Sequence, residues 1–80
     1  MLGEPHVILG KKGITEEYIN HILKLLKRFK IIKIKALRSI ANKSNIRALA
    51  SETSKLTDSY LLDVRGNIFV LSLYNIKKLN

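Results

Sequence analysis

The chain has 80 residues, enough for one small domain, and 46% of them are hydrophobic, which suits a packed core better than a disordered chain. Cysteine is absent, which excludes disulfides and thiol nucleophiles, and no apolar run approaches the ~20 residues of a membrane span. Fifteen Lys and Arg against six Asp and Glu give a net charge of +9, which favours a polyanionic partner. We expect a cytoplasmic protein that binds nucleic acid and no membrane.

A short strand, a glycine loop and a helix are predicted first. Residues 6–9 (HVIL) favour a strand that ends at Gly10, and Thr15 is a candidate N-cap followed by two glutamates. Apolar residues then recur at helical spacing, which predicts an amphipathic helix of about four turns. Its apolar stripe is Ile19, Ile22, Leu23, Leu26 and Phe29, with Tyr18 and Leu25 on the flanks. Its polar face is Asn20, Lys24, Lys27 and Arg28.

The hydrophobic period then changes to two. In residues 31–37, Ile32, Ile34 and Ala36 alternate with two lysines, which predicts a strand with one buried face. Residues 38–43 form a polar, basic loop, and Ser44 is the expected cap of a second helix. The apolar stripe of that helix is Ile46, Leu49, Ala50 and Thr53, extended by Leu56.

The last elements form a hairpin. Residues 60–64 and 68–73 favour strands and are joined through Arg65-Gly66-Asn67, while residues 75–80 are expected to form a basic, frayed tail. The order β-α-β-α-β-β predicts an α+β, two-layer fold with two helices on a mixed four-stranded sheet, whose first two strands are parallel. We expect a single domain over residues 1–80 with its core in residues 5–74.

No constellation for catalysis is evident in the sequence. His6 and His21 have no partner at metal or triad spacing, and no two acidic residues are placed as general acid and base. We therefore expect no enzyme activity and no cofactor.

The glycine loop has two interpretations. Gly10-Lys11-Lys12-Gly13 is either an ordinary strand-to-helix turn or a loop whose lysines and helix-start N–H groups hold a phosphate backbone. Such contacts position a nucleic acid without reading its bases. The candidate cations that extend this surface are Lys24, Lys27 and Arg28 of the first helix and Arg65 beside Gly66 in the hairpin. The lysines of the second strand either join it or only discourage edge pairing.

The segments "VILGKKGITEEYINHI", "IIKIKAL" and "IRALASETSKLTDSYLLDVRGNIFVL" together resemble the CRM domain (the YhbY family) over residues 5–73. The resemblance implies an RNA-binding domain with a KH-like fold, similar to the C-terminal domain of bacterial translation initiation factor three. Single-domain members are associated with precursors of the large ribosomal subunit, and plant relatives with group II intron splicing. The resemblance places Gly10, Lys11, Lys12 and Gly13 in the RNA-contacting loop, and Gly66 before the last strand.

Two departures from the family pattern are expected to matter. Members typically begin with a helix before the first strand, for which this chain offers no room, so part of the sheet is expected to be uncovered. Residues 68–73 are apolar on both faces, which makes a homodimer contact through that uncovered face possible. In addition, Leu71-Ser72-Leu73 replaces the family's closing Leu-Tyr-Arg.

Two other functions compete with RNA binding in large-subunit assembly. "VILGKKGI" and "IIKIKA" are also similar to the start of Alba chromatin proteins, which bind DNA or RNA, although those proteins have proline where this chain has Gly13 and carry a longer basic hairpin. A protein-interaction subunit that uses the apolar sheet face is the other alternative.

Overall fold

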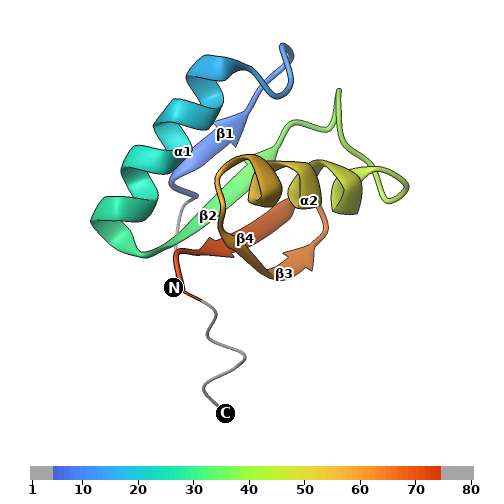
Figure 1. The fold of residues 1–80 in the computed structure, drawn as a ribbon. Helices are drawn as coiled ribbons and strands as arrows, with labels where there is room; N and C mark the ends of the chain where they lie inside the picture. Colours follow the sequence, from blue (N-terminus) through green and yellow to red (C-terminus); the bar gives the residue numbers. More distant parts are fainter. Residues whose placement is uncertain (1–4, 75–80) are drawn as a thin grey trace.

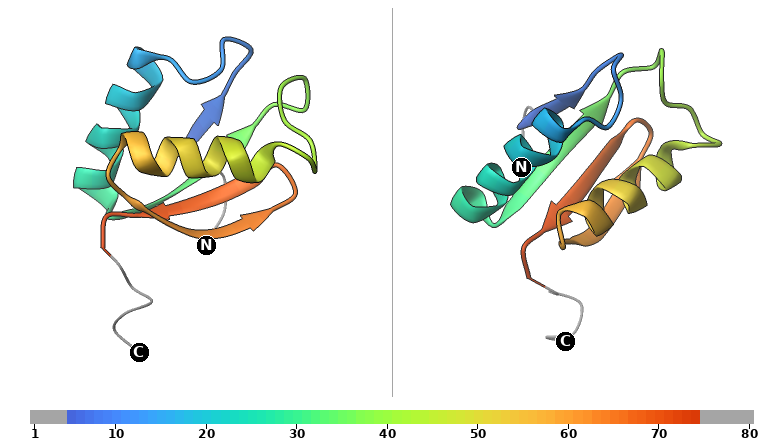
Figure 2. Two further views of the ribbon diagram at one scale, coloured as in Figure 1. Left: turned by 45° about the vertical axis from the view of Figure 1, so that its right-hand side comes forward. Right: turned by 45° about the horizontal axis from the view of Figure 1, so that its top comes forward.

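The fold is a four-stranded sheet with both helices on one of its faces, as Figures 1 and 2 show. A computed structural model describes residues 5–74 of the chain. The elements in chain order are β1 (Val7–Leu9), α1 (Glu16–Phe29), β2 (Ile31–Ala36), α2 (Ile46–Leu56), β3 (Tyr60–Arg65) and β4 (Ile68–Ser72). The predicted class and element order are therefore confirmed. The predicted basic tail over residues 75–80 lies outside the described residues.

The sheet has the strand order β1-β2-β4-β3. β1 pairs with β2 in parallel, and the other two pairs are antiparallel. The register places Ile34 of β2 between Val7 of β1 and Phe69 of β4. Because a parallel pair needs a crossover, α1 returns the chain from the end of β1 to the start of β2 over one face of the sheet.

The core lies between that face and the helices. Ile32, Ile34, Phe69 and Leu71 are fully buried, as the alternation in β2 predicts. The residues that complete the cluster are Val7, Leu9, Tyr18, Ile22, Leu26, Ala36, Ala41, Ile46 and Ala50. Both helices cover this apolar face, and within residues 5–74 no helix lies on the opposite face of the sheet.

The apolar stripe of α1 is shifted from the prediction. Ile22 and Leu26 are buried as expected, but Tyr18 is also buried and belongs to the centre of the stripe. Leu23 is 36% exposed because one step along a helix turns a side chain away by about 100°. Phe29, the last residue of α1, is 45% exposed, and the Arg28 guanidinium lies 5.3 Å from its ring centroid.

The start of α2 also differs from the prediction. Its N-cap is Asn45, not Ser44. Asn45 Oδ1 accepts a hydrogen bond from Asn42 N (2.7 Å), and its Nδ2 donates to Ile40 O (2.8 Å). Asn42 Oδ1 accepts from Ser44 N, so the two asparagines close the turn before α2, and Asn45 makes no side-chain cap hydrogen bond to the helix. Leu56, predicted to extend the stripe, is 53% exposed at the last helical position.

The hairpin is tighter than predicted. Arg65 pairs with Ile68 at the end of β3, so only Gly66 and Asn67 form the turn, and Gly66 has φ +55°. A register shift lies between Leu61 and Asp63. The extra residue keeps Leu61 and Val64 on the helix side while Asp63 and Arg65 occupy the opposite face.

Candidate nucleic-acid interface

Three loops meet at one end of the sheet. The ends of β1, β2 and β3 lie there, followed by residues 10–15, residues 37–45 and the hairpin turn (Figure 1). Leu37 N donates to Leu9 O (3.0 Å), and Ala36 N donates to Asn67 O (2.8 Å). These bonds hold segments that are distant in the sequence side by side. We call residues 10–15, residues 35–45 and residues 65–67 together the loop end.

The glycine loop is a closed turn that displays its two lysines. Gly13 N donates to Gly10 O at 2.9 Å, and both Lys11 and Lys12 are exposed between them. Gly13 has φ +73°, which disfavours any residue with a Cβ. Apart from the glycine and its two chain neighbours, no heavy atom lies within 4 Å of the position that a Cβ would take at Gly10 or Gly13. The turn therefore needs glycine at residue 13 for its conformation, and a partner has open access to the backbone.

The start of α1 is capped as the sequence predicts. Thr15 Oγ1 accepts a hydrogen bond from Tyr18 N at 3.1 Å, and Thr15 has extended backbone geometry. Glu16 and Glu17 follow in the first turn and are exposed. Because their carboxylates already offset the positive end of the helix dipole, attraction of a polyanion at this end depends chiefly on the lysines and arginines.

A second group of cations lines a hollow beside the hairpin turn. Its lining residues are Lys35, Arg38, Arg65, Gly66, Asn67 and Ile68. The sequence predicted Arg65 and Gly66 for the site but placed Arg38 only in a basic loop. The signal that identifies Arg38 is its position just after β2, because the ends of β1 and β2 meet at the same edge.

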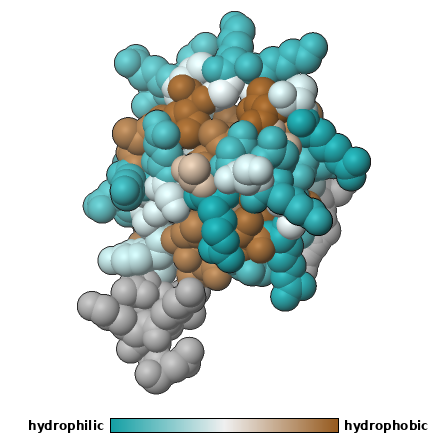
Figure 3. Space-filling model, turned by 90° about the vertical axis from the view of Figure 1, so that its right-hand side faces the viewer, coloured by the Kyte–Doolittle hydropathy of each residue, from teal (hydrophilic) through white to brown (hydrophobic). Residues whose placement is uncertain are grey.

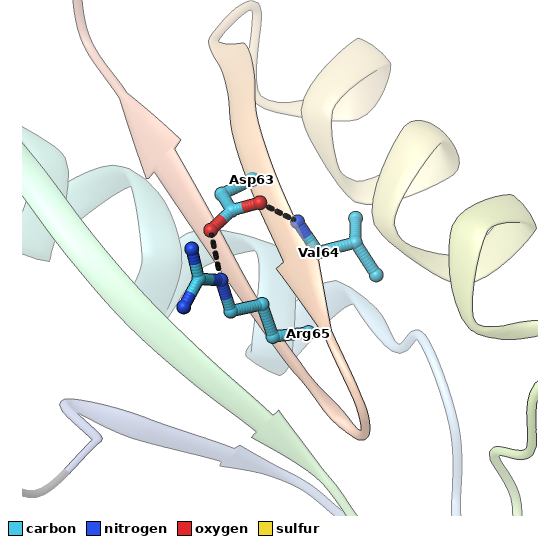
Figure 4. Close-up of polar contacts among 3 residues, drawn as sticks. All are labelled: Asp63, Val64 and Arg65. Carbon is cyan, nitrogen blue, oxygen red and sulfur yellow. Dashed lines mark hydrogen bonds and ion pairs between the residues drawn. The ribbon is translucent and has the colours of Figure 1, made fainter.

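Asp63 is the acidic neighbour of this hollow. Its carboxylate accepts from Val64 N at 2.9 Å and lies 3.0 Å from Arg65 Nε, as Figure 4 shows. The Arg65 side chain is 87% exposed and that of Asp63 is 52% exposed. A pair so open to water is weak, and it leaves the terminal nitrogens of Arg65 for another anion.

The candidate cations of α1 are not brought to the loop end. Lys24, Lys27 and Arg28 are exposed, and the last two lie in the final turn of α1, whose first turn adjoins the glycine loop. A helix of 14 residues spans roughly 20 Å at 1.5 Å per residue. These cations therefore form a separate group. Figure 3 shows hydrophilic side chains at the top of the molecule, where the loop between β1 and α1 projects in Figure 1.

The histidines lie outside this group. His6 Nδ1 accepts a hydrogen bond from Lys33 N at 3.0 Å, and the His6 ring centroid is 5.0 Å from that of Phe29. His21 is exposed on α1. Across residues 5–74 no three His, Asp or Glu side chains are grouped so that they could hold a metal ion. Neither helix described is long and apolar enough to cross a membrane.

Comparison with known proteins gives two findings. The family model of the CRS1/YhbY (CRM) domain matches residues 2–72. Among solved structures, the chain is similar to the solution structure of the hypothetical protein SAV1595 from Staphylococcus aureus, a candidate RNA-binding protein. The two share 30% sequence identity at a TM-score of 0.76, over 90% of this chain and 73% of that one. No curated protein matches the chain.

Proposed function

The chain belongs to the CRS1/YhbY (CRM) domain family, and we propose that it is an RNA-binding protein that contacts RNA with its loop end. The match covers most of the chain, and the similar structure from Staphylococcus aureus is that of a candidate RNA-binding protein. The net charge of +9 supplies the long-range attraction that a polyanion requires.

One observation carries the proposal. The fold gathers cations from three loops, distant in the sequence, at one end of the sheet. They are Lys11 and Lys12 from the glycine loop, Lys35 and Arg38 from the end of β2, and Arg65 from the hairpin. A structural turn between β1 and α1 would need Gly13, but it would not need exposed cations on each of the neighbouring loops as well.

The chemistry of these groups sets the kind of contact. Lysine ammonium groups and arginine forks bind phosphate oxygens, and the open approach to Gly10 and Gly13 lets a sugar–phosphate backbone come close. Such contacts carry no base identity. Selectivity then comes from the shape of the RNA and from which nucleotides are unpaired.

We infer further that the RNA is ribosomal and that the chain acts in the cytoplasm on the assembling large subunit. This narrower statement is supported by the resemblance of the glycine loop and the element order to single-domain CRM proteins. Folded ribosomal RNA offers a dense array of phosphates of defined shape, which suits a small basic domain that positions itself on backbone.

A charge-reversal experiment tests the loop end. The variant Lys11→Glu with Lys12→Glu is compared with Lys24→Glu with Lys27→Glu, which changes the net charge equally on the outer face of α1. Binding to a structured fragment of large-subunit ribosomal RNA is measured between about 50 and 200 mM salt. We expect the loop variant to lose about tenfold or more in affinity and the slope of log K against log salt to fall by about 2, with a clearly smaller loss for the helix variant.

Three results would contradict the proposal, each in a different way. Equal losses in the two variants would mean that net charge alone attracts the RNA. Equal affinity for duplex DNA of the same length would favour an architectural nucleic-acid protein of the Alba kind. Absence of RNA binding by the wild-type chain at low salt would favour a protein-interaction subunit.

A further inference from the structure

The sheet face turned away from the helices carries cations and aliphatic side chains in alternating positions. Since Ile32, Ile34, Phe69 and Leu71 point into the core, their sequence neighbours lie on the opposite face. Cross-strand pairing forms two rows there, Lys33 with Val70 and Asp63, and Ile8 with Lys35, Ile68 and Arg65. We call these two rows the open face.

The open face is continuous with the loop end. A hollow on it is lined by Lys33, Asp63, Arg65, Ile68 and Val70. Arg65 and Ile68 also line the hollow beside the hairpin turn. An RNA strand bound at the loop end can therefore continue directly onto the open face.

The charge of the open face favours a polyanion. Its cations are Lys33, Lys35 and Arg65, and its acidic side chain is Asp63. The Asp63 carboxylate is already engaged by Arg65 Nε and Val64 N (Figure 4). The field over this face is thus positive, as it is at the loop end.

The aliphatic side chains of the open face favour single-stranded RNA over duplex RNA as its ligand. Ile8 is 58% exposed, Ile68 is half-buried between Lys35 and Arg65, and Val70 is half-buried between Lys33 and Asp63. Tyr60, 45% exposed, pairs with Ser72 at the far end of the same face. A duplex keeps its bases stacked inside and presents phosphates and sugars to such a surface, whereas unpaired bases expose flat faces that pack on apolar side chains as they do on aromatic rings.

We propose that the open face binds a single-stranded segment of the same RNA, with phosphates at Lys35 and Arg65 and bases over Ile68 and Val70. The proposal rests on the function proposed above, because it extends the RNA path from the loop end. A second copy of the chain is the competing occupant. It fits less well, since a two-fold contact would pack this patch, which has three cations and one acidic residue, against an identical positive patch.

The test uses a variant that should tighten binding, which cannot be confused with unfolding. Asp63→Asn removes the negative charge but keeps an oxygen for Val64 N. With an oligouridylate of about ten nucleotides, we expect this variant to bind about two- to fivefold more tightly. Glu52→Gln, the same change of charge on exposed α2, is the control and should have a clearly smaller effect. Lys35→Gln should weaken binding by about threefold, and its control Lys55→Gln should not.

Methyl resonances of the wild-type chain supply the second measurement. On addition of the oligouridylate, the signals of Ile8, Ile68 and Val70 should shift, while those of the core residues Ile22 and Ile46 should not. An RNA duplex of equal length should shift the open-face signals less. These shifts together with the Asp63→Asn gain would support the inference.

Several results would overturn it, and they separate it from the proposed function. Suppose that the Lys11/Lys12 variant loses affinity for ribosomal RNA, while the open-face methyl signals do not shift and Asp63→Asn does not change affinity. The loop end would then remain the proposed RNA-binding site, and the open face would be rejected as one. Equal shifts with duplex RNA would refute the single-strand assignment. Shifts of the same methyls with protein concentration alone, alongside a dimeric mass, would assign the face to a second copy. Failure of every RNA to bind would refute both proposals.

Discussion

The phenol oxygen of Tyr18 on α1 lies 3.1 Å from Thr53 Oγ1 on α2, and this buried hydrogen bond joins the two helices above the sheet. Thr53 Oγ1 donates its own proton to Leu49 O at 2.9 Å, so the Tyr18 hydroxyl is the donor to Thr53. Tyr18 N is also the group that Thr15 caps. Tyr18, whose backbone N–H completes the helix cap that follows the glycine loop, is therefore also bonded to α2.

Removal of this hydroxyl should destabilise the domain. We expect Tyr18→Phe to lower the free energy of unfolding by about 1 kcal/mol, because a buried hydrogen bond is lost while the ring still fills its place. Urea denaturation followed by circular dichroism measures the change. Tyr60→Phe, at a residue 45% exposed, is the control and should change stability by less than about 0.5 kcal/mol. Equal effects in the two variants would contradict a role for the inter-helix bond.

The same tyrosine should make stability depend on alkaline pH. Burial raises the pKa of Tyr18 above its usual 10.0. Below pH 10 the Tyr18 phenol is protonated in both the folded and the unfolded state, so its contribution to stability is fully present. Above pH 10 the phenol of the unfolded state loses its proton first. The free energy of unfolding then falls until the pH passes the pKa of the folded state. The stability difference between wild type and Tyr18→Phe should therefore shrink above pH 10. Contributions common to both chains cancel in that difference. A difference that stays constant through this range would contradict the prediction.

The two glycines of the loop should respond differently to substitution. Gly13 has φ +73°, so Gly13→Ala should cost about 1–2 kcal/mol of stability, and Gly13→Asn should cost less. Gly10 lies outside the left-handed region and has free space around it, so Gly10→Ala should cost less than about 0.5 kcal/mol. Denaturation midpoints of the three variants decide this. A larger loss at Gly10 than at Gly13 would mean that the turn is not the one described.

Arg38 should contribute to RNA affinity although no motif marks it. It lines the same hollow as Arg65, so Arg38→Gln and Arg65→Gln should each lower the slope of log K against log salt by about 1, the loss of one phosphate contact. Lys55→Gln, in the last turn of α2, removes an equal charge as the control. If Arg38→Gln behaves like Lys55→Gln, the hollow is not part of the interface.

The hydrophobic period predicted the elements but not every boundary. The lysine alternation identified β2 and its buried face, and the spacing of apolar residues identified α1 and α2. The N-cap of α2 was misplaced because Asn42 and Asn45 close a turn through each other, a pairing that depends on three-dimensional geometry. Leu23 is exposed because it lies about 100° around α1 from the buried Ile22, and Phe29 is the last residue of the helix. The breadth of the apolar stripe in the sequence does not show which of its residues face the sheet.

The sequence likewise predicted part of the candidate site and missed another part. The glycine loop and the hairpin glycine could be found because backbone geometry restricts the residue types there, as φ +73° at Gly13 and φ +55° at Gly66 show. Arg38 and Lys35 join them only through the sheet topology, which aligns the ends of β1 and β2. The same topology separates Lys27 and Arg28 from the loop by most of the length of α1, although all are basic.

Ultraviolet crosslinking of the chain to RNA in its native lysate, with both the attached peptide and the attached RNA identified, tests the central claim most directly. We expect crosslinks in residues 10–15, in residues 35–45 and in residues 65–67, to sequences of large-subunit ribosomal RNA. Recovery of no RNA, or crosslinks confined to the outer faces of α1 and α2, would contradict it.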